Sequence, residues 1–213
     1  MASRFHERLS RLVGRPLFWV VLVALVAGVP LARTLRLRLP PPLPVLGTLP
    51  PYSFVNQHAQ PFGSKDLQGK VWIANFIFTR CPTVCPVFTA KMAGIQHRVR
   101  NLGDAIHLVS FSVDPEYDTP PVLLAYAQRH KASPRMWTFL TGDPESIKQT
   151  VVDGLKIAMG REGPADDLMS IFHGNHFVLV DAQGRIRGYY LSNDDQAVEN
   201  LVRDAGLLVN RGD

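Results

Sequence analysis

Residues 71–78, VWIANFIF, and the eight that follow them, TRCPTVCP (79–86), decide the fold of this chain. The first stretch is a nearly continuous apolar run of strand length, which is typical of a strand buried on both faces of a sheet. The second carries both cysteines of the chain, Cys81 and Cys85, and a helical pattern continues from it to about Asn101. The chain therefore places two thiols where a buried strand passes into a helix.

Strands and helices alternate through the rest of the chain, which predicts a layered α/β domain. Two cysteines at a strand end that opens a helix are typical of thioredoxin-like proteins. We therefore predict an α/β, thioredoxin-like fold with a central sheet flanked by helices. The predicted strands are 71–78, 106–113, 137–140, 176–180 and 186–191, and the predicted later helices are 119–131, 144–154 and 194–210.

The charge of the chain is concentrated at its N-terminus. The 213 residues carry a net charge of +5, but residues 1–38 hold seven arginines and one acidic residue, which leaves the remainder at −1. A protein that binds nucleic acid needs a basic face on its folded part. The sequence therefore gives no sign of a nucleic-acid partner, and the length fits one globular domain with an appendage.

An uncharged segment follows the basic tail. Residues 16–32, PLFWVVLVALVAGVPLA, are 17 residues long, at the short end of the range of about 17–25 for a helix that spans a membrane. The alternative is a cleaved signal peptide, but the run exceeds the usual apolar region of a signal and no clean A-x-A site follows. We predict a short basic tail over 1–15 and a single uncleaved transmembrane helix over 16–33.

Six prolines in residues 39–51 predict a stiff, extended spacer, so we divide the rest of the chain into a Pro-rich linker (34–51) and a domain (52–213). A short tail before a large domain suggests that the tail stays on the inner side of the membrane and the domain lies on the outer side. In a bacterium the protein would then lie in the inner membrane with its domain in the periplasm, which is an oxidising compartment.

The two cysteines are spaced C-x-x-x-C, which predicts a redox pair or a metal site. Residues i and i+4 share one side of a helix, and a helix start favours the thiolate and lowers the thiol pKa. Thiolates select Cu(I), zinc or iron–sulfur clusters, and two are too few for a Cys₄ zinc site or a cluster. Alternatives are a local structural disulfide or two buried apolar side chains. A thiol peroxidase would need a Thr three residues before the cysteine, where this chain has Phe78 or Pro82.

Two of the seven histidines, His173 and His176, lie at the entry to the predicted strand 176–180. In a thioredoxin-like fold this entry lies beside the cysteine pair. Thioredoxin-like reductants usually have a proline there, and this chain has none after residue 164. Imidazole suits copper, so either histidine could complete a site of two thiolates and one imidazole. We expect His107, inside a strand, to be a satisfied core residue.

The chain resembles the Sco/SenC family of copper proteins for cytochrome oxidase assembly over roughly residues 50–210. The resemblance rests on GKVW (69–72), FIFTRCPTVCP (76–86), SVDPE (112–116), DTP (118–120) and a distal His173. It implies that Cys81, Cys85 and His173 bind copper, as Cu(I) or Cu(II), and that the cysteine pair can also form a redox-active disulfide. It further implies that Asp114 lies near the site in a supporting role, although a turn or helix-capping carboxylate is an equal alternative.

Three functions fit these residues. The first is a copper metallochaperone that serves the dinuclear copper site of cytochrome c oxidase subunit II, which requires no enzymatic step. The second is a thiol–disulfide oxidoreductase that keeps target cysteines reduced, which needs Cys81 and Cys85 but not His173. The third is a redox- or copper-sensing module, which would need a partner surface that the sequence does not reveal.

Overall fold

The computed structural model describes residues 15–35, 40–81, 84–163 and 170–212, so most of the predicted basic tail lies outside the described residues. The chain divides into two units, 1–42 and 43–213. In the first unit, helix α2 (Pro16–Leu35) contains the uncharged segment. Within the described ranges, no helix is both long and apolar enough to cross a membrane. The transmembrane anchor therefore stays a prediction.

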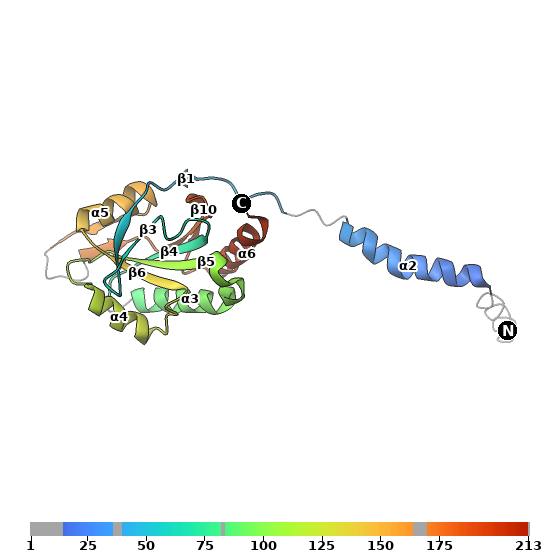
Figure 1. The fold of residues 1–213 in the computed structure, drawn as a ribbon, viewed down its shortest axis with the longest axis horizontal. Coiled ribbons are helices and arrows are strands. Elements are labelled where there is room, and N and C mark those ends of the chain that lie inside the picture. Colours follow the sequence, from blue (N-terminus) through green and yellow to red (C-terminus); the bar gives the residue numbers. More distant parts are fainter. Residues whose placement is uncertain (1–14, 36–39, 82–83, 164–169, 213) are drawn as a thin grey trace. The chain divides into compact units, whose positions relative to one another are not determined.

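The second unit is built on an eight-stranded sheet with β4 (Val71–Ile77) near its middle (Figure 1). On one side, β4 pairs in parallel with β5 (Ile106–Ser112), which pairs in parallel with β6 (Trp137–Thr141). On the other side, β4 pairs antiparallel with β9 (His176–Val180). The outer strands are β10 (Arg185–Leu191) and β1 (Gly47–Thr48) beyond β9, and β2 (Ser53–Asn56) and β3 (Pro61–Gly63) beyond β6.

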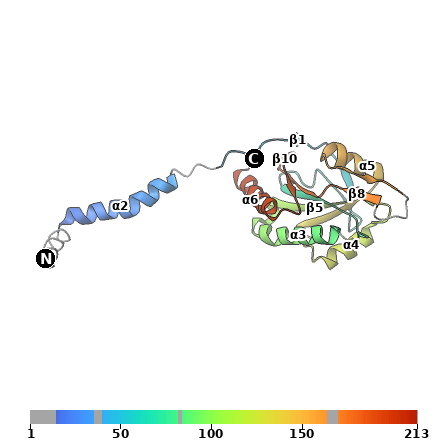
Figure 2. The same ribbon diagram turned by 180° about the vertical axis from the view of Figure 1, so that it is seen from behind.

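Helices cover both faces of the sheet because both faces of β4 are apolar. Trp72 and Phe76 point to one face, where the short helix α5 (Pro144–Lys148) and a π-helical turn, η2 (Gln149–Gly154), pack. Ile73 points to the other. That face is covered by α3 (Val84–Val99), α4 (Pro120–Arg129) and α6 (Asp195–Arg211), and Figure 2 shows α3 and α4 on the side of the sheet opposite α5. Burial of one large side chain of this kind contributes about 1.5–3 kcal/mol.

The α/β architecture predicted from the sequence is confirmed, with every predicted strand present to within a few residues. The strands that the sequence did not predict are short. They are β1 to β3 and a separate two-stranded ribbon of β7 (Met159–Arg161) and β8 (Ile171–His173), which pair antiparallel. Segments of two to four residues are too short to show alternation, so their apolar pattern carries no strand signal.

The linker predicted over residues 34–51 differs from the structure in its second half. Gly47 and Thr48 pair with β10, and Leu49 is buried at 9% exposure in the core. The division between the two units falls after Pro42, not at residue 51. Prolines are compatible with a sheet edge because an edge strand leaves half of its N–H groups unpaired. The domain therefore begins at Leu43.

Arg187 holds the first residues of the domain against its core. Its side chain is 4% exposed, and it donates to the carbonyl oxygens of Leu43 (2.6 Å) and Pro44 (3.2 Å). It also pairs with the fully buried Asp181 at 2.7 Å. Burial alone would raise the pKa of Asp181, but hydrogen bonds from Arg187 and Arg185 lower it below its ordinary value.

We expect Arg187→Ala to lower the free energy of unfolding by about 3 kcal/mol or more, because it leaves a buried carboxylate and two carbonyls without their donor. Arg185→Ala is the matched control, since Arg185 also contacts Asp181 at 2.7 Å but is 35% exposed. We expect it to cost less than about 1 kcal/mol. Urea unfolding measures both, and equal losses would contradict the assigned role of Arg187.

Candidate metal centre

Two of the three predicted ligands are in direct contact. Cys85 lies in the first turn of α3, His173 ends β8, and the distance from Cys85 Sγ to His173 Nε2 is 3.4 Å. Cys81 follows β4 by a short turn, and the Cys85 N–H donates to its Sγ at 3.4 Å. Cys85 is fully buried and Cys81 half-buried, and the two are not joined in a disulfide. The structure thus gathers all three predicted residues at one end of the central strand.

The distance between Cys85 and His173 fits two ligands of one ion. A thiolate at about 2.3 Å and an imidazole at about 2.0–2.1 Å from one ion lie about 3.6 Å apart at the tetrahedral angle. Among the described residues, however, no group of three or more His, Cys, Asp or Glu side chains is placed so that it could hold a metal ion. The spacing of Cys85 and His173 is compatible with two ligands of one ion, and Cys81 contacts the amide of Cys85, but the set of three ligands stays a prediction.

The orientation of His173 leaves Nε2 without a hydrogen, so this nitrogen could bind a metal ion. Its Nδ1 lies 3.1 Å from the carbonyl oxygen of Gly174, and because a carbonyl can only accept, Nδ1 carries the hydrogen. The ring is stacked on Phe88 and meets Phe78 edge-on. Burial lowers the pKa of His173 more than the bond to Gly174 raises it. The imidazole is therefore neutral at pH 7, which is the form that binds metals.

Burial raises the pKa of the Cys85 thiol to about 12, although a backbone hydrogen bond at Phe78 lowers it. The prediction that the helix start lowers this thiol pKa is therefore wrong for Cys85. The cause is that the side chain is fully buried, and the loss of water disfavours a thiolate more than the helix start favours it. Cys85 is a thiol at neutral pH and must lose a proton when it binds a metal.

Two buried carboxylates hold the residues that precede Cys81. Asp118 is fully buried and accepts from the Thr79 N–H (3.1 Å), the Thr79 hydroxyl and the Ser112 hydroxyl (2.6 Å). Burial raises its pKa, while these hydrogen bonds lower it in part. The DTP motif contains Asp118, but the sequence alone gave no reason to connect its carboxylate with Thr79, which lies 39 residues earlier.

Asp114 supports the same loop through arginine. It is 3% exposed and accepts from Arg80 Nη2 at 2.6 Å, while Arg161 of β7 lies 3.5 Å away on its other oxygen. The Arg80 guanidinium also lies 4.0 Å above the ring of Tyr117. The backbone carbonyl of Asp114, not its carboxylate, accepts from the N–H groups of Tyr117 and Asp118 in the turn that follows. The carboxylate thus holds Arg80, the residue that precedes Cys81, and its predicted supporting role at the site stays a prediction.

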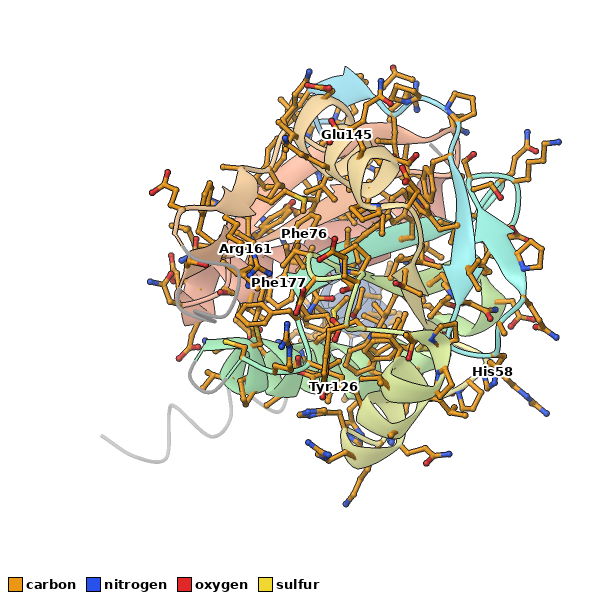
Figure 3. The ribbon with its side chains drawn as sticks, turned by 90° about the vertical axis from the view of Figure 1, so that its left-hand side faces the viewer. His58, Phe76, Tyr126, Glu145, Arg161 and Phe177 are labelled. Atoms are coloured by element: carbon orange, nitrogen blue, oxygen red, sulfur yellow. The ribbon has the colours of Figure 1, made fainter. Side chains whose placement is uncertain are left out.

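Two other histidines of the described domain, His176 and His107, have partners other than the cysteines. His176 begins β9, pairs with Leu191 and lines a surface pocket with Lys156 and Tyr189. His107 is 6% exposed and hydrogen-bonded to Thr138 at 2.9 Å, which confirms that it is a satisfied core residue. Figure 3 looks onto the side of the domain where β7 carries Arg161.

The raised thiol pKa predicts that the affinity for Cu(I) increases with pH between 6 and 8. Below a pKa of about 12 the Cys85 thiol is protonated, so binding releases one proton and affinity rises about tenfold per pH unit from this residue alone. Chelator competition at several pH values measures the slope. Cys85→Ser should lower the slope by about one, and an affinity independent of pH would contradict the assignment.

A sequence model of the SCO1/SenC family matches residues 46–204, and the chain belongs to this family. It is 32% identical to a SCO1 protein homolog of Bacillus subtilis over 155 residues, which is 72% of this chain and 79% of that one. The matched range contains both cysteines, His173, Asp114 and Asp118.

Solved structures of the family have the same fold. A SCO1/SenC family lipoprotein from Bacillus anthracis superposes with a TM-score of 0.70 at 36% identity, over 76% of this chain and 95% of that one. BsSco, of the Sco family of cytochrome c oxidase assembly proteins, has a TM-score of 0.69 at 29% identity, over 79% and 97%, and contains a disulfide switch. Arabidopsis thaliana ScoI with copper bound has a TM-score of 0.63 at 25% identity, over 75% and 99%.

Proposed function

We propose that this protein is a copper metallochaperone that binds copper through Cys81, Cys85 and His173. The observation that carries the proposal is the 3.4 Å contact between Cys85 Sγ and the available Nε2 of His173. Two thiolates and one imidazole suit Cu(I), and imidazole also suits Cu(II). A copper-bound structure among the family relatives supports the same metal.

We further propose that the copper passes to the dinuclear site of cytochrome c oxidase subunit II. The support is that a family relative is a cytochrome c oxidase assembly protein. Transfer by ligand exchange needs no general acid or base, but it does need one ligand within reach of the target. Cys81 is half-buried, whereas Cys85 is fully buried, so an incoming thiolate would displace Cys81 first.

A thiol–disulfide oxidoreductase is the second candidate. Cys81 Sγ lies against the amide of Cys85, and a disulfide switch occurs in a relative. Reduction of a target disulfide would form a bond between the two sulfurs and transfer two electrons and two protons to the target cysteines. His173 has no required part in that reaction, so substitution of His173 separates the two functions.

We expect the reduced protein to bind one copper per chain, and His173→Ala to weaken Cu(I) binding by about tenfold or more while its reduction of a test disulfide is unchanged. His176→Ala is the matched control, because His176 is three residues away and faces a different pocket. It should bind copper as the unaltered protein does. An affinity for Cu(I) that is unchanged in His173→Ala, or an unaltered protein that binds no copper, would favour the oxidoreductase.

We also propose that residues 16–33 attach the protein to the bacterial inner membrane, with the domain in the periplasm. The support is the uncharged run of 17 residues between arginines. We expect the protein to remain with membranes after alkaline carbonate extraction and to be cleaved by protease added to spheroplasts. A variant that lacks residues 1–42 should be released. Extraction of the full chain by carbonate, or protection from protease, would contradict the arrangement.

A further inference from the structure

We propose that the thioether sulfur of Met159 is an additional ligand for Cu(I) at the site of Cys85 and His173, and that it makes the site selective for the reduced metal. The proposal rests on the copper function above and assigns a role to a residue outside the C-x-x-x-C and histidine pattern. It follows from the ribbon of β7 and β8, which the sequence did not predict.

The register of the ribbon places Met159 opposite His173. These two residues are direct partners in the antiparallel pair of β7 and β8. Directly opposed residues project from the same face, with Cβ atoms about 4.5–5.5 Å apart. His173 extends toward Cys85. The side chain of Met159 therefore leaves the ribbon on the face that is turned to the cysteines.

The next pair of the ribbon identifies the opposite face. Gly160 is the partner of Phe172, and a Cβ atom added to Gly160 would lie 2.9 Å from the Phe172 ring. That ring is 40% exposed, so it covers Gly160 on the solvent side. Arg161 returns to the inner face, where it reaches Asp114, the carboxylate that holds Arg80 beside Cys81. Met159 is thus flanked by two side chains of the same face that both contact the cysteine region.

Met159 and the thiols belong to the same side of the sheet, since all three pack in or against one apolar cluster. Met159 and Cys81 are both half-buried, and both pack against the core cluster that contains Cys85 and Phe78. Against this apolar cluster the sulfur atom has little contact with water. An ion bound to the sulfur would also have little contact with water. A ligand without charge suits a singly charged ion better than a doubly charged one under these conditions.

A thioether differs from a thiolate in two ways that matter here. It is a soft, neutral donor that favours Cu(I) over Cu(II), and it has no proton to release when it binds. Met159 would therefore raise the affinity for Cu(I) with little effect on Cu(II), and it would leave the pH dependence set by the two thiols unchanged. A methionine that only fills space would change neither affinity selectively.

The test uses the full-length reduced protein, with its five methionines replaced by selenomethionine and one Cu(I) bound per chain. We expect X-ray absorption at the selenium edge to show a copper neighbour at bonding distance, and Met159→Leu to abolish it. Leucine preserves the apolar volume, so the variant should fold. We also expect Met159→Leu to weaken Cu(I) binding about tenfold and Cu(II) binding less than about threefold.

Met136→Leu is the matched control, because Met136 is also half-buried but packs on the other face of the sheet. It should retain the copper signal and both affinities. Absence of a copper neighbour at the selenium edge, with sulfur and nitrogen neighbours present at the copper edge, would overturn the role of Met159 and leave the chaperone proposal intact. Failure to bind Cu(I) at all would overturn both.

Discussion

The contact between Cys85 and His173 joins two parts of the chain that are 88 residues apart, and the proposed metal site depends on it. Each partner is fixed by a different element. Cys85 is held in the first turn of α3, which packs on one face of the central sheet, and His173 ends a ribbon strand whose partner is β7. Because Gly174 fixes the hydrogen on Nδ1, the ring presents its other nitrogen to the thiol.

The loop between β4 and α3 is held by buried charge as well as by apolar packing. Thr79 is bound by Asp118 and Arg80 by Asp114, so the two residues before Cys81 are each tied to the turn after β5. Both carboxylates are buried, and a buried carboxylate is stabilised only while its donors remain in place. These bonds restrict the path of the chain into Cys81, while Cys81 itself keeps partial access to solvent. The proposed transfer of copper to a partner would need this combination.

Much of the fold could be predicted from the sequence, because the strands at the centre of the sheet have strong patterns. The run 71–78 is apolar on both faces, and the structure buries every residue of β4. The motif residues Cys81, Cys85 and His173 could be found because their types and positions resemble a known family. His173 could not be separated from His176 by the residues alone, and the ribbon of β7 and β8 explains the difference by turning only His173 toward the thiol.

Other parts could not be predicted, for physical reasons. The high pKa of Cys85 depends on complete burial, which the position at a helix start does not reveal. The hydrogen bonds that Asp114 accepts from Arg80 and Asp118 accepts from Thr79 span 34 and 39 residues, so no local pattern signals them. The proline-rich segment has the composition of a spacer, yet Arg187 and the pairing with β10 bind part of it to the domain. In each case the deciding partner comes from a distant part of the chain.

The proposed convergence of three residues on one ion can be tested by X-ray diffraction from crystals of the reduced, Cu(I)-loaded protein, with anomalous data on both sides of the copper absorption edge. We predict a single copper peak per chain, bonded to the Sγ atoms of Cys81 and Cys85 and to Nε2 of His173, with Nδ1 still on the carbonyl of Gly174. A copper peak bonded elsewhere, or a copper atom held by the two cysteines with His173 turned away, would contradict the proposed site.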